Sequence, residues 1–174
     1  MDREQAVMAV NRRSGRAVVL ILAWLGAGTA CTSWQRPLPP AGLADQVRGH
    51  SLVLRRVLVF PAGETRLYFQ HGRQQRAQDL TVWEPHCAWV AYRRPARRWV
   101  LAAGRLPVIR ARAREELAFW GRGIVSWVTR IDFAPVAGQP LALECERWGY
   151  DVYAGPLTAA EFHAAMGDWV QRVP

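Results

Sequence analysis

From residue 51 onward, short apolar runs alternate with polar or Pro/Gly-rich segments, which is the pattern of an antiparallel β protein. The runs are rich in β-branched, aliphatic and aromatic residues, which favour a pleated, half-buried surface. Candidate strands lie at residues 52–54, 57–60, 65–70, 80–83, 87–92, 99–101, 106–109, 124–131 and 141–146. Because only a Pro/Gly segment separates the runs at 57–60 and 65–70, we expect these two strands to form a hairpin.

The clearest helix signal lies near the C-terminus. Thr158 and Glu161 have the spacing of a capping box, in which the two side chains satisfy each other's free backbone N–H groups. The residues that follow on one apolar face are Phe162, Ala165 and Met166. Gly167 then provides a stop, so we expect a short helix that begins after Thr158.

Residues 111–119 leave two alternatives open, because their helix propensity favours a short helix and a long edge hairpin fits them nearly as well. The chain shows no internal repeat and no second linker, so residues 51–174 are expected to form a single β-rich domain. The expected fold class is mostly β or α+β. It consists of about six to eight antiparallel strands in a β-sandwich or open barrel with one C-terminal helix.

Residues 1–30 have the layout of an export signal. Arg12, Arg13 and Arg16 precede an apolar run at 17–25 and small residues at 26–30. A positive region, an apolar region and a small-residue cleavage site are together typical of a secretory signal peptide. The apolar run is about half as long as the ~20 residues that span a bilayer as a helix, so a permanent membrane span is not expected.

Cys31 directly follows this signal, as the lipid-modified cysteine does in bacterial lipoproteins. We expect its thiol to carry a diacylglyceryl anchor, and the alternative is simple cleavage after Ala30 without a lipid. Residues 31–50 carry several prolines and no periodicity, and we predict that they form a tether. Because Thr32 rather than aspartate follows the cysteine, the expected location is the periplasmic face of the outer membrane.

The chain is strongly basic, with a formal net charge of +9, and its basic side chains are all arginines. A basic surface attracts nucleic acid and anionic lipid alike. An exported protein has little access to nucleic acid, so nucleic acid is not an expected partner. The expected anionic partners are therefore lipid head groups, lipopolysaccharide phosphates or acidic glycans.

Two cysteines, Cys87 and Cys145, remain once Cys31 is acylated. In an oxidising compartment this count predicts one disulfide. A cysteine-based metal site is the alternative, but it needs more ligands at tight spacing than the sequence offers. We therefore predict a Cys87–Cys145 bridge and no metal or other cofactor.

Residues 61–72 fit the pattern P-x-G-x-x-R-x-x-x-Q-x-G, and residues 83–87 fit aromatic-E-P-x-C. Together with a later cysteine within a strand, Cys145, these motifs resemble a family of proteobacterial envelope lipoproteins over about residues 50–170. The resemblance implies an envelope location, a β-rich fold and a disulfide, but no activity. The chain departs from the usual lipoprotein signal at Gly28, where leucine, valine or isoleucine is more common.

The polar residues of greatest interest are Arg66, Gln70 and Glu84. Arg66 and Gln70 have the same parity on one predicted strand, so their side chains would project from one face. One interpretation is a binding surface for a carboxylate or phosphate group, which arginine recognises with two parallel hydrogen bonds. The favoured interpretation is structural: an Arg66–Glu84 ion pair that ties the first hairpin to the strand at 87–92.

The sequence contains no hydrolase elbow and no His-rich metal motif, so we assign no catalytic residue. The leading hypothesis is a non-enzymatic, lipid-anchored cell-envelope protein that acts as an interaction or assembly module. The alternative is a binding protein for an anionic envelope ligand, either a glycan or a lipid head group, and an enzyme ranks third. A deep cleft lined by Arg66 and Glu84 would favour the ligand, whereas an exposed strand edge would favour a protein partner.

Overall fold

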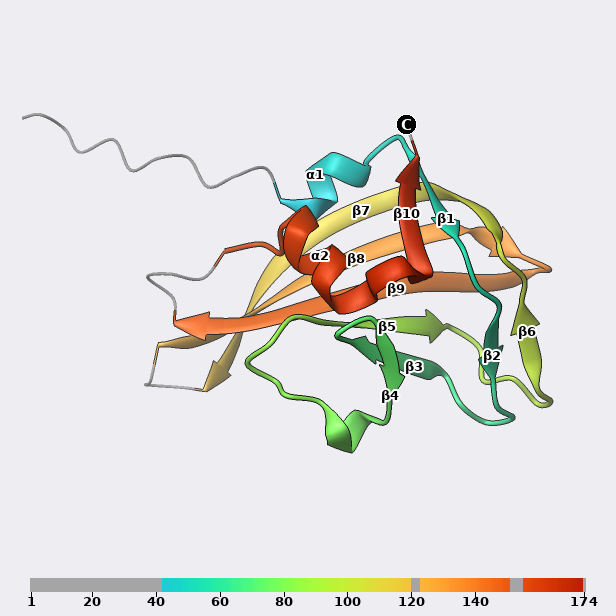
Figure 1. Ribbon diagram of the computed structural model, residues 1–174, viewed down its shortest axis with the longest axis horizontal. Coiled ribbons are helices and arrows are strands. Elements are labelled where there is room, and N and C mark those ends of the chain that lie inside the picture. Colours follow the sequence, from blue (N-terminus) through green and yellow to red (C-terminus); the bar gives the residue numbers. More distant parts are fainter. Residues whose placement is uncertain (1–41, 120–122, 151–154, 174) are drawn as a thin grey trace, which may run out of the picture. The chain divides into compact units, whose positions relative to one another are not determined.

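A computed structural model describes residues 42–119, 123–150 and 155–173 (Figure 1). These residues form one eight-stranded sheet in the order β10-β1-β7-β8-β9-β5-β3-β4 and a separate two-stranded sheet of β2 and β6, with antiparallel pairing throughout. The strands are β1 (Ser51–Leu54), β2 (Leu58–Phe60), β3 (Arg66–Gln70), β4 (Arg73–Gln75), β5 (His86–Ala91), β6 (Trp99–Leu101), β7 (Gly104–Phe119), β8 (Ile124–Val136), β9 (Gln139–Tyr150) and β10 (Val170–Val173). The helices are α1 (Leu43–Val47) and α2 (Ala159–Met166), and short 3-10 turns lie at Ala77–Asp79 and Gly167–Trp169.

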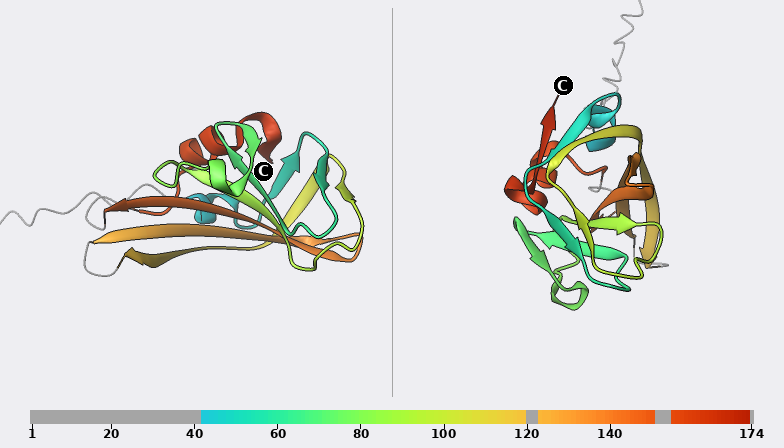
Figure 2. Two further views of the ribbon diagram at one scale, coloured as in Figure 1. Left: turned by 90° about the horizontal axis from the view of Figure 1, so that it is seen from below. Right: turned by 90° about the vertical axis from the view of Figure 1, so that its right-hand side faces the viewer.

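The large sheet curls into a half-barrel, and its long strands β7, β8 and β9 pass beneath the helices (Figure 2). A single apolar core joins the sheet to both helices. Its largest fully buried side chains include Trp89, Phe69 and Phe133. The expected fold class, a mostly β open barrel with a C-terminal helix, is confirmed.

Side chains alternate between two faces of strands β5, β9 and β8, as the period of a strand requires. The inner face, which contacts the helices, carries Cys87, Trp89, Ile131, Phe133, Leu143 and Cys145. The outer face carries His86, Ala88, Val128, Arg130, Glu144 and Glu146. The terms inner face and outer face are used in this sense below.

The turn after β3 meets the end of α2 at a contact between two glycines. A Cβ atom on Gly167 would lie 2.8 Å from the Cα atom of Gly72, and both residues have positive φ. The backbone N–H of Gly72 donates to the carbonyl of Ala165, and the indole of Trp169 donates to the carbonyl of Gly72. This contact joins the β3–β4 hairpin to the C-terminal segment, and only glycine permits such an approach.

Helix α2 has the predicted cap. Thr158 is its N-cap, the Thr158 hydroxyl accepts from the backbone N–H of Glu161, and the Glu161 carboxylate accepts from the backbone N–H of Thr158. The helix ends at Gly167 and buries Phe162, Ala165 and Met166. No helix in the described part of the chain is long and apolar enough to cross a bilayer.

The prediction of a tether over residues 31–50 is wrong for its last part. Leu43–Val47 form α1, and its Leu43, Ala44 and Val47 side chains are buried in the core. The signal peptide (1–30) and the first residues of the tether lie outside the described residues. Five helical residues within a Pro/Gly-rich stretch give too short a pattern for sequence periodicity to detect.

Two strand predictions are also wrong. The expected hairpin of 57–60 with 65–70 does not form, because β2 pairs with β6 and buries Leu58 and Phe60 there. Residues 80–83 form turns rather than a strand. For residues 111–119, the hairpin alternative is the one observed, as part of β7 paired with β8.

Candidate functional site

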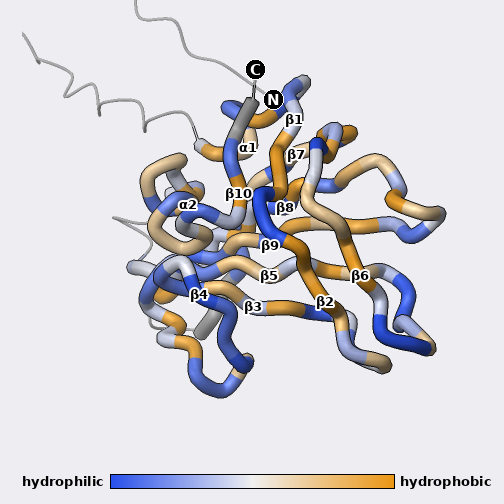
Figure 3. Tube along the Cα trace, turned by 45° about the vertical axis from the view of Figure 1, so that its right-hand side comes forward, coloured by the Kyte–Doolittle hydropathy of each residue, from blue (hydrophilic) through white to orange (hydrophobic). Residues whose placement is uncertain are grey.

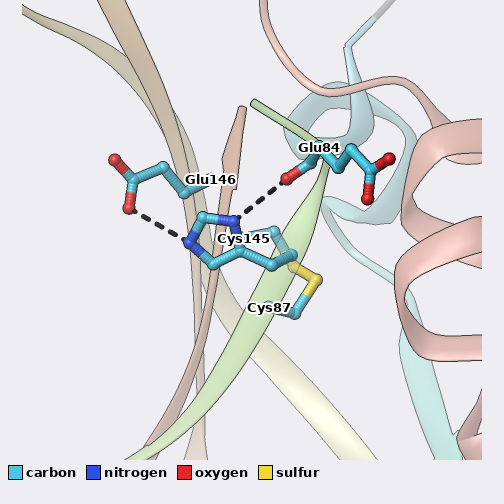
Figure 4. Close-up of a disulfide and its surroundings, with 5 residues drawn as sticks. Glu84, Cys87, Cys145 and Glu146 are labelled. Carbon is cyan, nitrogen blue, oxygen red and sulfur yellow. Dashed lines mark hydrogen bonds and ion pairs between the residues drawn. A yellow bond between two sulfur atoms is a disulfide. The ribbon is translucent and has the colours of Figure 1, made fainter. Parts of the chain in front are cut away.

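Cys87 and Cys145 face each other across β5 and β9, and their Sγ atoms lie at bonding distance on the inner face (Figure 4). The predicted disulfide is therefore present, and it joins two buried side chains of the core. Cys31, the predicted lipidation site, lies outside the described residues.

Gln70 is a structural residue. Its side chain is buried, its amide nitrogen donates to the carbonyls of Thr81 and Glu84, and its amide oxygen accepts from the backbone N–H of Thr81. These bonds satisfy the backbone of the loop that follows the 3-10 turn at Ala77–Asp79. Gln70 therefore holds this loop against the end of β3 and is not available to a ligand.

The predicted Arg66–Glu84 ion pair does not form. Arg66 binds Glu144 on β9 at 2.7 Å, and Glu84 binds His71 at 2.7 Å. Arg66 begins β3, whereas the Glu84 backbone contacts Gln70 at the other end of the strand. At ~3.4 Å per residue, a five-residue strand separates its two ends by more than an ion-pair distance.

The outer face holds an ion-pair network centred on Asp132. This carboxylate is 6% exposed, and it accepts from the Tyr92 hydroxyl and from the Nε atoms of Arg110 and Arg130, both at 3.0 Å. Arg130 also donates to Glu144 at 2.6 Å and to the Tyr92 hydroxyl. Through Glu144 the network reaches Arg66, so it links β3, β9, β8 and β7.

The hydrogen bonds of this network shift the pKa of Asp132. Burial favours the neutral carboxyl group, but donation from Tyr92, Arg130 and Arg110 outweighs it and lowers the pKa of Asp132. The carboxylate is therefore charged and fully paired. Such a group stabilises the fold and does not act as a base, because its lone pairs are already occupied.

A second cluster surrounds Glu146 on the same face. The Ser126 hydroxyl and the Trp148 indole both donate to Oε1 of Glu146. His86 lies 3.5 Å from Oε2 of Glu146. Figure 4 marks this contact of Glu146 with a dashed line. His86 donation, with that of Ser126 and Trp148, lowers the pKa of Glu146 to about 2 against the effect of burial. Burial disfavours the charged form of His86, but its bonds to Glu146 and to the Glu84 carbonyl raise its pKa.

Ser126, His86 and Glu146 are the residue types of a catalytic triad, but they are connected in a different order. In a triad the histidine lies between the serine and the acid. Here Glu146 lies between Ser126 and His86, and the serine donates its proton to a carboxylate. This geometry gives the hydroxyl no basic nitrogen to accept its proton, so the cluster is a cross-strand tie between β5, β8 and β9.

Three aromatic side chains gather beside this cluster. Trp83, in the loop held by Gln70, packs edge-on against Trp148 and stacks on Tyr150. Trp83 and Tyr150 are 50% and 57% exposed. The other tryptophans among the described residues are at least partly buried.

Two clefts border Arg66, one of about 190 Å³ and one of about 330 Å³, and Glu84 lines neither. Three carboxylates line the smaller cleft: Glu116, Glu144 and Glu146. Its two arginines, Arg66 and Arg114, are already paired with Glu144 and Glu116. An anion would have to displace these carboxylates, and Glu84 is not part of the lining. The condition for an anion-binding cleft at Arg66 and Glu84 is therefore not met.

The condition for a protein partner is met at β7. Its first residues, 104–107, pair with β1, but from Arg110 onward β8 is the only strand that pairs with it among the described residues. Helix α1 also contacts β7. The side chains of Arg110, Arg112, Arg114, Glu115 and Glu116 are exposed. We call residues 110–119 the free edge of β7.

No protein-family model matches the chain, and neither a curated protein nor a solved structure is significantly similar to it. The resemblance to envelope lipoproteins therefore stays a prediction. In the described part of the chain, no three His, Cys, Asp or Glu side chains lie close enough together to hold a metal ion.

The sequence analysis missed the Asp132 and Glu146 clusters. A signal was present, since charged residues alternate along 110–116 and 144–146, but it predicts an outer face without naming the partners. Partner choice depends on cross-strand register, and one residue of slip changes every pair.

Proposed function

We propose that this protein is a non-enzymatic, lipid-anchored protein of the bacterial cell envelope that acts as an interaction or assembly module. The observation that supports a protein partner is the free edge of β7, whose outward backbone donors and acceptors pair with no other strand among the described residues. A strand from another chain can add to such an edge through main-chain hydrogen bonds. The anchor at Cys31 and the envelope location rest on the sequence signal.

The charges of the edge select the partner. Arg110, Arg112 and Arg114 project from the outer face, and exposed charges on an edge strand discourage indiscriminate pairing. Arg110 and Arg114 already bind Asp132 and Glu116, whereas Arg112 has no carboxylate at ion-pair distance among the described residues. An acidic residue opposite Arg112 would pair with it, and a basic one would be repelled. We therefore expect an extended partner segment with an acidic residue opposite Arg112.

Crosslinking in intact cells tests this proposal. A photoreactive residue in place of Arg112 should capture a discrete partner, while the same residue in place of Ala164, exposed on helix α2 and away from any strand edge, should not. The captured segment should carry an acidic residue opposite position 112. Equal capture at both positions, or none at Arg112, would contradict a role for the edge.

The anchor is tested separately. Mass spectrometry of the mature N-terminus should find a lipid-modified cysteine at residue 31. The Cys31→Ser variant should leave the membrane fraction. An unmodified Cys31 at a free N-terminus would rule out anchoring.

A further inference from the structure

Among the side chains that the structure describes, the excess of positive charge is concentrated at one end of the domain. The end consists of β2, β6 and the loops at 55–57 and 93–98, and we call it the basic end. Its described side chains include six arginines, Arg55, Arg56, Arg93, Arg94, Arg97 and Arg98, and the adjacent loop at 61–64 adds one acid, Glu64. The other described side chains comprise ten arginines and ten acids, so they are balanced.

The arginines of the basic end are exposed, as Arg66, Arg110 and Arg114 of the outer face also are, but those three are each paired with a carboxylate. Among the described residues, no carboxylate lies at ion-pair distance from these six guanidinium groups. Arg56 packs over the ring of Trp169, and this contact leaves its charge without an acidic partner. In Figure 3, hydrophilic segments flank the apolar strands β2 and β6 at both ends.

An apolar strip lies between the two groups of arginines. Val59 pairs with Val100 across β2 and β6, and Val57 continues the strip. Val57 and Val100 are each 50% exposed. On the other side of the same strands Leu58, Phe60 and Leu101 are buried in the core. The side chains of the strip therefore face away from the core.

We propose that the basic end docks on an anionic lipid bilayer, with its arginines at the head groups and Val57 and Val100 at the acyl boundary. Exposed apolar side chains flanked by arginine are the combination that interfacial membrane binding requires. Arg56 and Arg97 lie beyond opposite ends of the three-residue strands β2 and β6, so a single phosphate cannot contact both groups. An array of anionic head groups can.

This inference uses the proposed envelope location only as the source of the anionic surface, and it does not depend on the free edge of β7. Anchored by a lipid at Cys31, the protein would gain a second membrane contact that fixes its orientation. A lipid chain and a basic patch act together in many peripheral proteins.

Vesicle binding tests the inference. The full chain with Cys31→Ser, which cannot be acylated, is titrated with vesicles of phosphatidylglycerol and phosphatidylcholine, or of phosphatidylcholine alone. We expect tighter binding to the anionic vesicles, and a loss of this preference as salt shortens the screening length. Any contribution of the apolar run at 17–25 is common to all variants and both vesicles.

The charge variant is Arg94→Gln with Arg97→Gln, which should weaken binding to anionic vesicles by about tenfold or more. The matched control is Arg48→Gln with Arg76→Gln, which removes two exposed arginines elsewhere, each paired with a nearby aspartate. The control should bind almost as well as the parent. Equal losses in both variants, or equal binding to both vesicle types, would overturn the inference.

The valines distinguish a bilayer from a soluble anion. Val57→Thr with Val100→Thr keeps the β-branched shape but removes apolar surface, and should weaken vesicle binding several-fold while leaving binding of soluble polyphosphate unchanged. Vesicle binding that is unaffected by this change would mean that the arginines serve a soluble anionic ligand, and docking on a bilayer would be contradicted. The Arg112 crosslink reports on the proposed protein partner independently of either result.

Discussion

The two faces of strands β5, β9 and β8 are stabilised in different ways. The inner face is apolar and covalently joined, with Cys87–Cys145 beside the fully buried Trp89 and Ile131. The outer face is polar, and the buried carboxylate of Asp132 and the partly buried carboxylate of Glu146 are each held by several donors. Apolar burial tolerates many partners, whereas a buried charge needs particular ones, so we expect the outer face, together with the inner-face disulfide, to discriminate between strand registers.

The largest expected effect is on the inner face. Cys87→Ser with Cys145→Ser should lower the free energy of unfolding by about 4 kcal/mol, because it frees a loop of more than 50 residues in the unfolded chain. Denaturant titration measures the change, and reductant should destabilise the parent but not the variant. Two freely labelled thiols in the denatured, non-reduced parent would contradict the bridge.

The second-largest effect on stability is expected at Asp132, the centre of the ion-pair network on the outer face. Asp132→Ala leaves Arg130, itself only 17% exposed, without one of its partners, and should cost about 3 kcal/mol of unfolding free energy. The matched control is Asp45→Ala, which breaks an exposed pair with Arg48 and should cost well under 1 kcal/mol. Similar costs for the two variants would show that the network does not stabilise the sheet.

The two faces also differ in how well the sequence predicts them. The inner face follows from alternation along each strand and from the cysteine count, and the cap of α2 follows from Thr158 and Glu161 alone. Each of these signals is local or needs only a residue count. The Arg66 interaction could not be predicted because Glu84 and Glu144 are equally acidic in sequence, and only the pairing of β3, β5 and β9 decides between them.

Helix propensity failed at residues 111–119 for a related reason. Ala111 and Ala113 suit a helix, but they also fit the inner face of a strand beside β8, where Ala111 is buried. Tertiary packing outweighs propensities of a few tenths of a kcal/mol per residue. The sequence therefore predicted the types of residue at the candidate site better than the contacts between them.

The pH dependence of stability tests the Glu146 cluster. The folded pKa of Glu146, about 2, lies below its ordinary 4.5, so its contribution is complete above about 4.5 and is lost as the pH falls towards 2. The pKa of His86 is raised above 6.5, so its contribution is complete below that value and is lost as the pH rises through the folded pKa.

As far as this pair contributes, the melting temperature should therefore be highest between about pH 4.5 and 6.5. Glu146→Gln should flatten both limbs of the profile. The effect should be smaller than that of Asp132→Ala, because the Glu146 side chain is one-third exposed and solvent screens it. A variant profile that is parallel to the parent profile would contradict the assignment.

The smallest effect contrasts two hydroxyls of β8. Thr129 is fully buried on the inner face, and its hydroxyl has no hydrogen-bond partner among the described residues, so Thr129→Val should be neutral or stabilising by about 1 kcal/mol. Ser126 on the outer face donates to Glu146, so Ser126→Ala should destabilise by about 1 kcal/mol. Chemical denaturation measures the sign of the stability change in both variants. A clear loss of stability in Thr129→Val would mean that the Thr129 hydroxyl has a hydrogen-bond partner.

The proposed interaction module depends most directly on the free edge of β7, and hydrogen exchange resolved at single amides measures that edge in the isolated protein. We predict that alternate amides along residues 112–116 exchange fast, because they point away from β8, while those between them and the amides of β9 at 141–146 are protected. Addition of the captured partner strand should slow the fast set. Uniform protection along 112–116 in the isolated protein would show that the edge is already paired, and would contradict the account.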